Sequence, residues 1–463
     1  MSIKPTIVAV VLAIIGVVGA VALYSTEPAR SGGLLVTLPG AAKIPLDAVN
    51  QIAVRRADEV EMLFVRSGDA WEQVEPLQFP MDAFSIRRLI IEATEVVVVR
   101  VLGPGEAATA DLGLAQPRAE VTWTWPDGSY TLQFGRRSVA GRSYLRPAGD
   151  QDVYVVTGDL YQRAVEMNPK EWRDRTIFAP LAARITGIEI DDGDRRVVIE
   201  MRRKRWFMTE PARTRVDAAA AEVLVAAIGR ARSAGFILDL PPDLSRFGLA
   251  EPSGALTVQS ERQVVQGDRV LTVAETARLL VGSRTGIGSE DRFGMVEGRA
   301  AVVRLPEAVV AAFFPKAVRL VDPTPSGVQP ADVKAIVIRR GDGELKLRRD
   351  VERWTAPDLG ADADPVIVER LLKLLSTARA TDIEIVDMPL YEVAGRSITL
   401  YGFDGMPMET IRFAASPPSG RPGLALDNGD NVWRIFPESM QIPLTREDFG
   451  IGVTEETRAS ELD

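Results

Sequence analysis

Carboxylates are the residues of this chain whose types and spacing come closest to a catalytic set. Two carboxylates that face each other can serve as acid and base in glycoside hydrolysis without help from His. The first cluster falls where a hairpin turn is expected, and turns select Asp because its side chain bonds to nearby backbone amides. We therefore predict structural roles for both clusters and no catalytic residue. The clusters are Asp191, Asp192 and Asp194, and Asp382, Glu384 and Asp387.

Other patterns for ligands and nucleophiles are incomplete. Asp191-Asp192-Gly193-Asp194 lacks the alternating ligands and the closing Glu of a calcium loop. The glycine-rich run from Gly282 to Ser289 lacks the Lys-Ser/Thr ending of a phosphate loop, which favours a turn between strands. Ser143 and Ser289 lie in no nucleophile elbow. We expect no metal ion and no cofactor.

Composition narrows the function further. The chain contains no Cys, so disulfides, thiolate metal sites and Cys nucleophiles are excluded. It contains no His, the side chain that titrates nearest neutral pH and the base of most Ser triads. The formal net charge of −9 argues against nucleic acid, because binding to phosphates requires a basic surface. We expect a protein that is not an enzyme and that does not bind nucleic acid.

Two features have both a binding and a structural interpretation. The run Arg202-Arg203-Lys204-Arg205 could contact anionic lipid or a partner, but its place in a strand region favours a solvated turn. Trp71, Trp206 and Trp354 could stack on a ligand. Each stands just before a Pro and an expected helix, and this shared position favours a role in the core.

The positions around the first two tryptophans are repeated along the chain. Every matched position is displaced by one constant, 206 − 71 = 252 − 117 = 135, so the two copies align without a gap. Such self-similarity indicates one folding unit copied in tandem. A looser third copy runs from Trp354 through Pro357 to Asp364 and lacks the Gly-Leu-x-x-Pro ending. The matched sets are Trp71, Pro76, Asp82 and Leu112 to Pro117, and Trp206, Pro211, Asp217 and Phe247 to Pro252.

The order of strand pair, Trp, Pro, helix-capping Asp and Gly-Leu-x-x-Pro resembles the bacterial family catalogued as domain of unknown function 4340. The resemblance covers about Val49 to Pro315 in two good copies and a degenerate third copy to about Pro443. It implies a membrane-anchored extracytoplasmic repeat protein, often met beside export machinery of the gliding-motility ABC type. It implies no catalytic residue. The residues that carry it are Trp71, Pro76, Asp82, Gly113, Leu114 and Pro117, and Trp206, Pro211, Asp217, Gly248, Leu249 and Pro252.

Local patterns predict the elements of each copy. Asp82, Asp217 and Asp364 are suited to cap helices over Ala83–Glu95, Ala218–Ala231 and Val366–Ala378. Short runs of branched and aromatic residues separated by turns predict antiparallel hairpins, the first joining 51–56 to 61–66. The insert at Gln259 to Val273 is less regular than its counterpart, so its pairing stays open. The predicted fold is α+β, with three tandem repeats that each hold a small antiparallel sheet and helices.

A length of 463 residues suits about three domains. The apolar run Ile7–Leu23, with Tyr24, would form a helix about 27 Å long, enough to span a bilayer. Lys4 before it favours the N-terminus inside and the bulk of the chain facing the periplasm or outside. Cleavage at Ala20-Val21-Ala22 stays open. We expect a transmembrane signal anchor at 1–24, a linker at 25–47, repeats at 48–182, 183–322 and 323–449, and a polar tail at 450–463.

These observations favour a non-enzymatic scaffold or accessory protein on the outer side of the cytoplasmic membrane, with a protein partner in the envelope. A link to an ABC-type transport or gliding-type complex is implied by the family resemblance alone. The alternative is an extracytoplasmic module that binds a glycan or a peptide in clefts between repeats. A carboxylate hydrolase is third, because the chain has no His.

Overall fold

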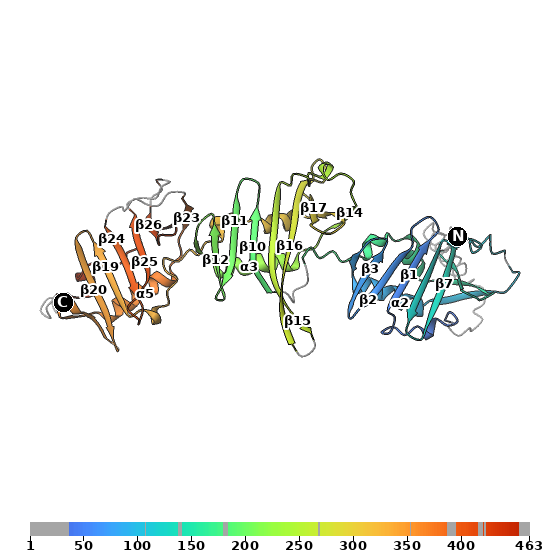
Figure 1. Ribbon diagram of the computed structural model, residues 1–463, viewed down its shortest axis with the longest axis horizontal. Helices are drawn as coiled ribbons and strands as arrows, with labels where there is room; N and C mark the ends of the chain where they lie inside the picture. Colours follow the sequence, from blue (N-terminus) through green and yellow to red (C-terminus); the bar gives the residue numbers. More distant parts are fainter. Residues whose placement is uncertain are drawn as a thin grey trace, which may run out of the picture. The chain divides into compact units, whose positions relative to one another are not determined.

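The computed structural model describes residues 37–106, 108–137, 141–178, 184–266, 269–351, 353–386, 395–414, 420 and 423–452 (Figure 1). Within these residues lie three nine-stranded antiparallel sheets, one after another along the chain, with the same strand order. The tandem units are as the repeated motifs predict, but the chain is mostly β with a few helices where α+β was predicted, because each sheet is larger than the small sheet expected. Two compact units divide the chain between Asp174 and Arg175, and the second unit holds the second and third sheets.

The strands of the first repeat are β1 (Gln51–Arg56), β2 (Met62–Ser67), β3 (Ala70–Glu75), β4 (Phe79–Met81), β5 (Val97–Leu102), β6 (Ala119–Trp125), β7 (Gly128–Arg137), β8 (Ser143–Pro147) and β9 (Val153–Thr157). Those of the second are β10 (Arg184–Asp191), β11 (Arg196–Arg202), β12 (Arg205–Glu210), β13 (Thr214–Arg215), β14 (Gly235–Asp239), β15 (Gly254–Gln266), β16 (Arg269–Arg284), β17 (Arg292–Val296) and β18 (Ala301–Leu305). Those of the third are β19 (Ala335–Arg340), β20 (Gly343–Asp350), β21 (Arg353–Ala356), β22 (Ala361–Ala363), β23 (Asp382–Ile385), β24 (Arg396–Tyr401), β25 (Pro407–Ala414), β26 (Leu424–Asp427) and β27 (Val432–Phe436).

The helices confirm the predicted ranges to within a residue at each end. The three capped helices are α2 (Ala83–Thr94), α3 (Ala218–Arg230) and α5 (Pro365–Thr377). A shorter helix, α4 (Glu307–Phe313), follows the last strand of the second sheet. No helix in the described ranges is both long and apolar enough to cross a membrane. The apolar run Ile7–Leu23, predicted to be a membrane anchor, lies outside those ranges.

Each sheet consists of two four-strand meanders that meet at their first strands, and of a ninth strand at one edge. In the first repeat the order is β4-β3-β2-β1-β6-β7-β8-β9-β5, so β1 pairs with β6 at the centre. The helix leaves the edge strand β4 and delivers the chain to β5 at the opposite edge. Nine strands laid flat would span about 38 Å, whereas a helix of this length measures about 18 Å. The sheet must therefore curve so that both edges come within reach of the helix.

Each capping Asp joins the helix to the end of its own repeat. The Asp82 side chain accepts a hydrogen bond from the Phe84 amide at 2.9 Å, as predicted for an N-cap. Its backbone amide donates to the Trp172 carbonyl at 2.8 Å. The same pair of contacts recurs at Asp217, which bonds to Leu320, and at Asp364, which bonds to Phe449, at 2.8 and 2.9 Å. The closing segment of every repeat is thus fastened to the start of its helix.

The core of each repeat lies between the helix and one face of the sheet. Along β6, the buried Ala119, Val121 and Trp123 alternate with more exposed residues, which places one row of side chains toward α2. The helix contributes its buried stripe from the same side. Each fully buried Leu or Ile contributes about 1.5–3 kcal/mol relative to exposure. The buried Ile86, Leu89 and Ile90 of this single helix therefore contribute a large part of the stability of the core.

The Gly-Leu-x-x-Pro loop covers a small patch on the opposite face. Leu114 and Leu249 are buried there in equivalent apolar clusters. Gly113 and Gly248 have φ values of +72° and +64°, which glycine adopts without strain. The loop backbone also lies directly against a strand glycine. A Cβ on Gly135 would stand 2.3 Å from the Leu112 carbonyl oxygen, and one on Gly282 would stand 2.1 Å from that of Phe247.

These approaches predict that Gly135→Ala and Gly282→Ala lift the loop from the sheet. Each change should destabilise its repeat by roughly 1–3 kcal/mol, because the carbonyl and the strand must separate. Amide hydrogen exchange of the full chain checks this at Arg136, whose amide donates to the Leu112 carbonyl at 2.8 Å. Gly235→Ala is the control, because nothing lies within 4 Å of a Cβ there. Equal protection in Gly135→Ala and Gly235→Ala would contradict the prediction.

Candidate functional site

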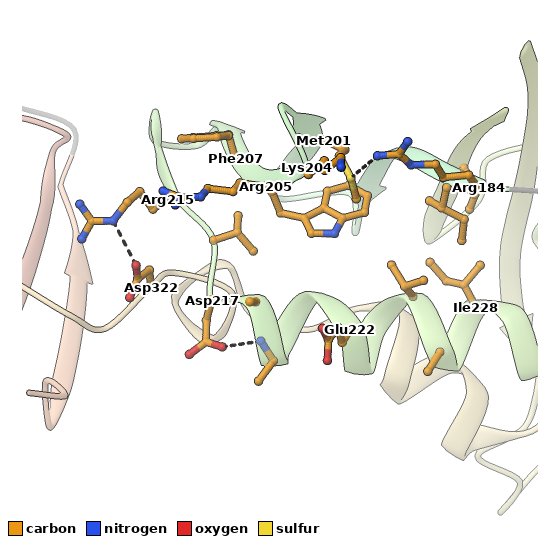
Figure 2. Close-up of a pocket in the computed structure, with 18 of the residues that line it drawn as sticks. Arg184, Met201, Lys204, Arg205, Phe207, Arg215, Asp217, Glu222, Ile228 and Asp322 are labelled. Carbon is orange, nitrogen blue, oxygen red and sulfur yellow. Dashed lines mark hydrogen bonds and ion pairs between the residues drawn. The ribbon is translucent and has the colours of Figure 1, made fainter. Parts of the chain in front are cut away.

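The second repeat contains a cavity of about 1240 Å³ between α3 and its sheet. Figure 2 shows Lys204 and Arg205 on the sheet wall, opposite Asp217, Glu222 and Ile228 on the helix. Between these charged residues, the lining of the cavity is largely apolar. The volume of the cavity exceeds the roughly 300–1,000 Å³ usual for a small-molecule site. The apolar lining includes Phe178, Ile185, Trp206, Val225, Ile228, Val258 and Ala277.

Small residues on the helix create part of this space. At two inward positions the middle helix carries smaller side chains than its counterparts. Replacing a buried Ile by Ala costs about 2–5 kcal/mol when the surroundings do not collapse. The middle repeat therefore gives up stability that the other two repeats keep. The residues four and eight positions after the capping Asp are Ile86 and Ile90 in the first repeat, Val368 and Leu372 in the third, and Ala221 and Val225 in the second.

Small residues on the sheet create the rest. Val258 pairs with Ala277 across β15 and β16, and the corresponding pair in the first repeat is Trp123 with Tyr130. The two pairs are equivalent because Val258 and Trp123 each lie opposite the first buried isoleucine of the central strand. Trp123 is fully buried and its ring lies 6.2 Å from that of Tyr130. Two aromatic rings that fill the first repeat are thus replaced by two small side chains.

The third repeat shows how the same position is closed. The Trp354 indole nitrogen donates a hydrogen bond to the Glu369 carboxylate on α5 at 3.2 Å. Arg349, opposite Trp354 on β20, also donates to Glu369 and lies 5.0 Å from the centre of the indole ring. This Trp–Glu–Arg set, which we call the clasp, joins the strand to the helix. Trp354 is only 2% exposed as a result.

The second repeat holds two of the three clasp residues. Trp206 and Glu222 occupy the places of Trp354 and Glu369, but Met201 stands opposite Trp206 where the clasp requires Arg. No ion pair reaches Glu222 from any residue that the structure describes. Trp206 is only partly buried and lines the cavity. The expected core role thus holds for Trp71 and Trp354, whereas it is wrong in part for Trp206.

Positive charge gathers on the sheet wall. Arg184, Lys204 and Arg205 all line the cavity and are exposed. Arg203 and Lys204 have φ values of 48° and 67° in the turn between β11 and β12, which confirms the predicted solvated turn. Among the described residues, no carboxylate forms an ion pair with Lys204 or Arg205. These two cations are available to an anionic group at the cavity.

The far end of the cavity reaches a polar joint with the third repeat. Arg215 donates to the Asp322 carboxylate at 3.0 Å, to the Thr324 carbonyl at 3.0 Å and to the Glu409 carboxylate. Glu409 also accepts from the Gly327 amide at 3.1 Å and from the Ser326 hydroxyl. These contacts surround the proline-rich segment 322–327, which fills the interface between the two repeats.

A second buried cation completes this joint. Arg434 is fully buried and donates to the Asp430 carboxylate at 3.0 Å, to the Thr214 hydroxyl at 2.9 Å and to the Asp322 carbonyl at 2.8 Å. Val432, on the same strand, belongs to the core of the second repeat. Removing one partner of such a buried pair leaves an uncompensated charge, so the joint holds the two repeats in one arrangement.

The candidate catalytic residues remain dispersed. Asp191 accepts from the Gly193 amide and Asp192 from the Arg195 amide, both at 2.9 Å, as predicted for a hairpin turn. Asp382 and Glu384 lie on β23, and Asp387 lies outside the described residues. The described carboxylates form no group of three that could hold a metal ion.

The predicted turn near Gly282 and the two serines are equally ordinary. Gly282 to Arg284 complete β16, and residues 285–291 connect it to β17, where the Thr285 and Ser289 hydroxyls bond to each other at 2.9 Å. Ser143 is buried in β8. Neither serine lines the cavity.

A family model described as domain of unknown function (DUF4340) matches the chain twice, over residues 71–237 and 206–394. The chain belongs to the domain of unknown function 4340 family. No curated protein and no solved structure matches it significantly.

The family matches begin at Trp71 and Trp206, in the third strand of a sheet. One match of the domain of unknown function 4340 family therefore spans the greater part of one repeat and continues through the helix of the next. The family's sequence unit and the folded unit are out of phase. The matched ranges include the strand, cis proline and capping Asp that position the helix, at Glu75-Pro76 and Glu210-Pro211.

Sequence reasoning missed the cavity in this family member. A signal was present, because α3 is rich in alanine where the other helices carry Ile and Leu. Met201 could be recognised only after the register had placed it opposite Trp206. The joint was hidden because Thr214 and Arg434 are far apart in the sequence.

The joint predicts a large effect from Arg215→Met. Loss of this guanidinium leaves Glu409 and Asp322 without their cation, which should cost about 3–5 kcal/mol. Native-state hydrogen exchange at the Ser326 and Ala380 amides measures the free energy of opening. Arg202→Met is the matched control, because its pair with Glu200 is exposed and should be worth no more than about 1 kcal/mol. Equal effects of the two substitutions would show that the joint contributes little.

Asp217 gives the joint a dependence on pH. Burial opposes ionisation of its carboxyl, but hydrogen bonds from Arg379 and from the Ala220 and Ala219 amides outweigh this, so the pKa lies below its ordinary value. An acid with a lowered pKa stabilises the fold above its unfolded value of about 3.9, and loses that contribution as pH falls through the folded pKa.

We therefore expect the stability advantage of the native chain over Asp217→Asn to shrink on acidification. Asn is also a good N-cap, so the comparison isolates the charge and its partner Arg379, whose nitrogen lies 2.6 Å away. Thermal unfolding between about pH 6 and pH 2 measures the difference. An advantage that stays constant over this range would refute the assignment.

Proposed function

We propose that this chain is a non-enzymatic, membrane-anchored extracytoplasmic accessory protein that binds a protein partner. The observation that carries the proposal is the long hairpin of β15 and β16. Figure 1 shows it running past the ends of the neighbouring strands. In the first sheet the equivalent hairpin ends at the pair Trp125 and Gly128, whereas here six further pairs follow, from Glu261–Ala274 to Gln266–Arg269.

This extension, residues 261–274, which we call the arm, is unusually apolar for an exposed ribbon. It is about 20 Å long at the usual rise of a strand. Val265 and Val270 are 72% and 61% exposed, and Leu271 and Val273 are also exposed. Val264 and Leu271 pair on one face, while Val265 and Val270 pair on the other. A two-stranded ribbon is marginally stable in water, so a partner that covers the apolar side chains would stabilise it.

The edges of the arm favour the same interpretation. The neighbouring strand β10 ends its pairing at Arg184 and Glu261, so beyond that point the edge of β15 that faces away from β16 has no strand beside it among the described residues. The arm contains neither Pro nor Lys, which commonly protect such edges. An edge of this kind accepts a strand from another protein.

Location completes the proposal. The uncharged run Ile7–Leu23 and the preceding Lys4 support a single membrane span with the sheets on the outer side. The absence of His and Cys supports a role without proton-transfer or thiol chemistry. An ABC-type transport or gliding-type complex is the partner that the family resemblance implies.

A second function, the binding of an extracytoplasmic ligand, is favoured by the cavity. A volume of about 1240 Å³ beside a partly exposed Trp206 is suited to a ligand that fills the space left by smaller residues. The two functions are compatible, because no residue of the arm lines the cavity, although the strand pair Ser260–Glu275 beside the arm does.

Shortening the arm tests the first function. Residues 261–274 are replaced by Asp-Gly, which leaves a hairpin as short as that of the first repeat. The second repeat should stay folded, and membrane proteins that copurify with the native chain after mild detergent extraction should be lost. Crosslinking from position 265 in cells should identify the same proteins.

The control replaces Thr272 by Ser, which retains the pairing and the apolar residues. Copurification that survives the shortened arm would overturn the proposal, provided that the thermal unfolding of the shortened chain matches the native one.

A further inference from the structure

We infer that the cavity of the second repeat binds an amphiphile with a long apolar chain and an anionic headgroup. The inference deepens the ligand-binding function proposed above and does not depend on the arm. Three independent features of the described residues support it: an open clasp, an apolar interior and cations without carboxylate partners.

The open clasp means that no side-chain bond of this kind draws the helix onto the strand in the second repeat. In the third repeat, Arg349 and Trp354 both bond to Glu369 and close the helix onto the strand. In the second repeat, Met201 stands where the clasp has Arg349, and its side chain cannot donate a hydrogen bond. Glu222 and Trp206 therefore lack the third member of the clasp. The strand and the helix keep two clasp residues, and the missing third leaves the space between them accessible.

The interior of the cavity selects an apolar body. Val258 and Ala277 form its floor where the first repeat has two aromatic rings. Val225 and Ile228 line the helix side, and Trp206 on β12 lines the sheet side. Apolar cavity walls of this kind accommodate apolar groups. Its volume is larger than a typical small-molecule site, which favours a long chain over a compact ligand.

The charges select the headgroup. Arg184, Lys204 and Arg205 lie on the sheet wall in Figure 2. Arg184 donates to the Met201 sulfur at 3.3 Å, a weak acceptor, so its guanidinium can also serve an anion. On the helix side, the Asp217 carboxylate is already neutralised by Arg379 at 2.6 Å. A carboxylate or a phosphate would form charge-assisted hydrogen bonds with the sheet wall.

A fatty acid and a phospholipid share this chemistry, and the experiment distinguishes them. The full chain is reconstituted into nanodiscs of phosphatidylcholine, and brominated palmitate is added as a quencher of tryptophan fluorescence. Brominated phosphatidylglycerol within the disc is the second arm of the experiment. The neutral methyl ester of brominated palmitate is the third. Quenching by an anionic probe at concentrations where the ester has no effect is the expected result.

Trp206→Phe identifies the residue that is quenched. If the ligand lies in the cavity, this substitution should remove most of the quenching, whereas Trp354→Phe should leave it unchanged. Lys204→Met combined with Arg205→Met should weaken the anionic probe by about tenfold or more and leave the ester unaffected. The control pair is Lys43→Met with Arg230→Met, two exposed cations outside the cavity lining.

Met201→Arg provides the decisive test. It supplies the missing clasp residue opposite Trp206, so Glu222 should be engaged and the cavity closed, as in the third repeat. Quenching should fall at least tenfold while thermal stability is kept or raised. Met406→Arg adds the same charge at an exposed place and should change nothing.

Native quenching in Met201→Arg, or unchanged quenching in Trp206→Phe, would overturn the inference. So would the absence of quenching by both anionic probes, which would leave the cavity to a peptide. Loss of copurification on shortening the arm is independent of every one of these results.

Discussion

The packing of one helix across a curved nine-stranded sheet is the constraint on which each repeat depends. The helix connects the two edges of the sheet, covers the core and receives the closing segment of its repeat at the capping Asp. Trp71, Pro76 and Asp82 recur because they set where the helix begins relative to the third strand. The side chains between helix and sheet decide how this interior is filled, and in the second repeat smaller side chains leave a cavity there.

The space between helix and sheet is therefore treated differently in each of the three repeats. The first uses aromatic residues on the sheet, the third uses larger aliphatic residues on the helix with the clasp, and the second leaves the space open. The framework that surrounds the open space is kept intact, since Asp217 caps α3 and Leu320 closes the repeat. Tandem copying makes this arrangement feasible, because the neighbouring third repeat is joined to the second by buried charges and supports it.

Local signals in the sequence were sufficient for the helices, the first hairpin and the turns. Asp82, Asp217 and Asp364 predicted the helix starts because N-capping is a short-range interaction. The crossing of β5 to the far edge could not be predicted, because strand order depends on contacts between distant segments. The insert at Gln259 to Val273 proved to be a regular ribbon, although its mixed pattern obscured the pairing. The closing residues Trp172, Leu320 and Phe449 were missed because they share a backbone role and not a residue type.

The buried joint has a consequence for how such chains can evolve. Arg434 of the last repeat donates hydrogen bonds to Thr214 and Asp322 of the middle repeat, so the stability of each repeat depends on the sequence of the other. Recombination that exchanged or duplicated only one of these two repeats would leave a buried guanidinium without its partners in the other repeat. The two repeats should therefore be inherited together as a pair.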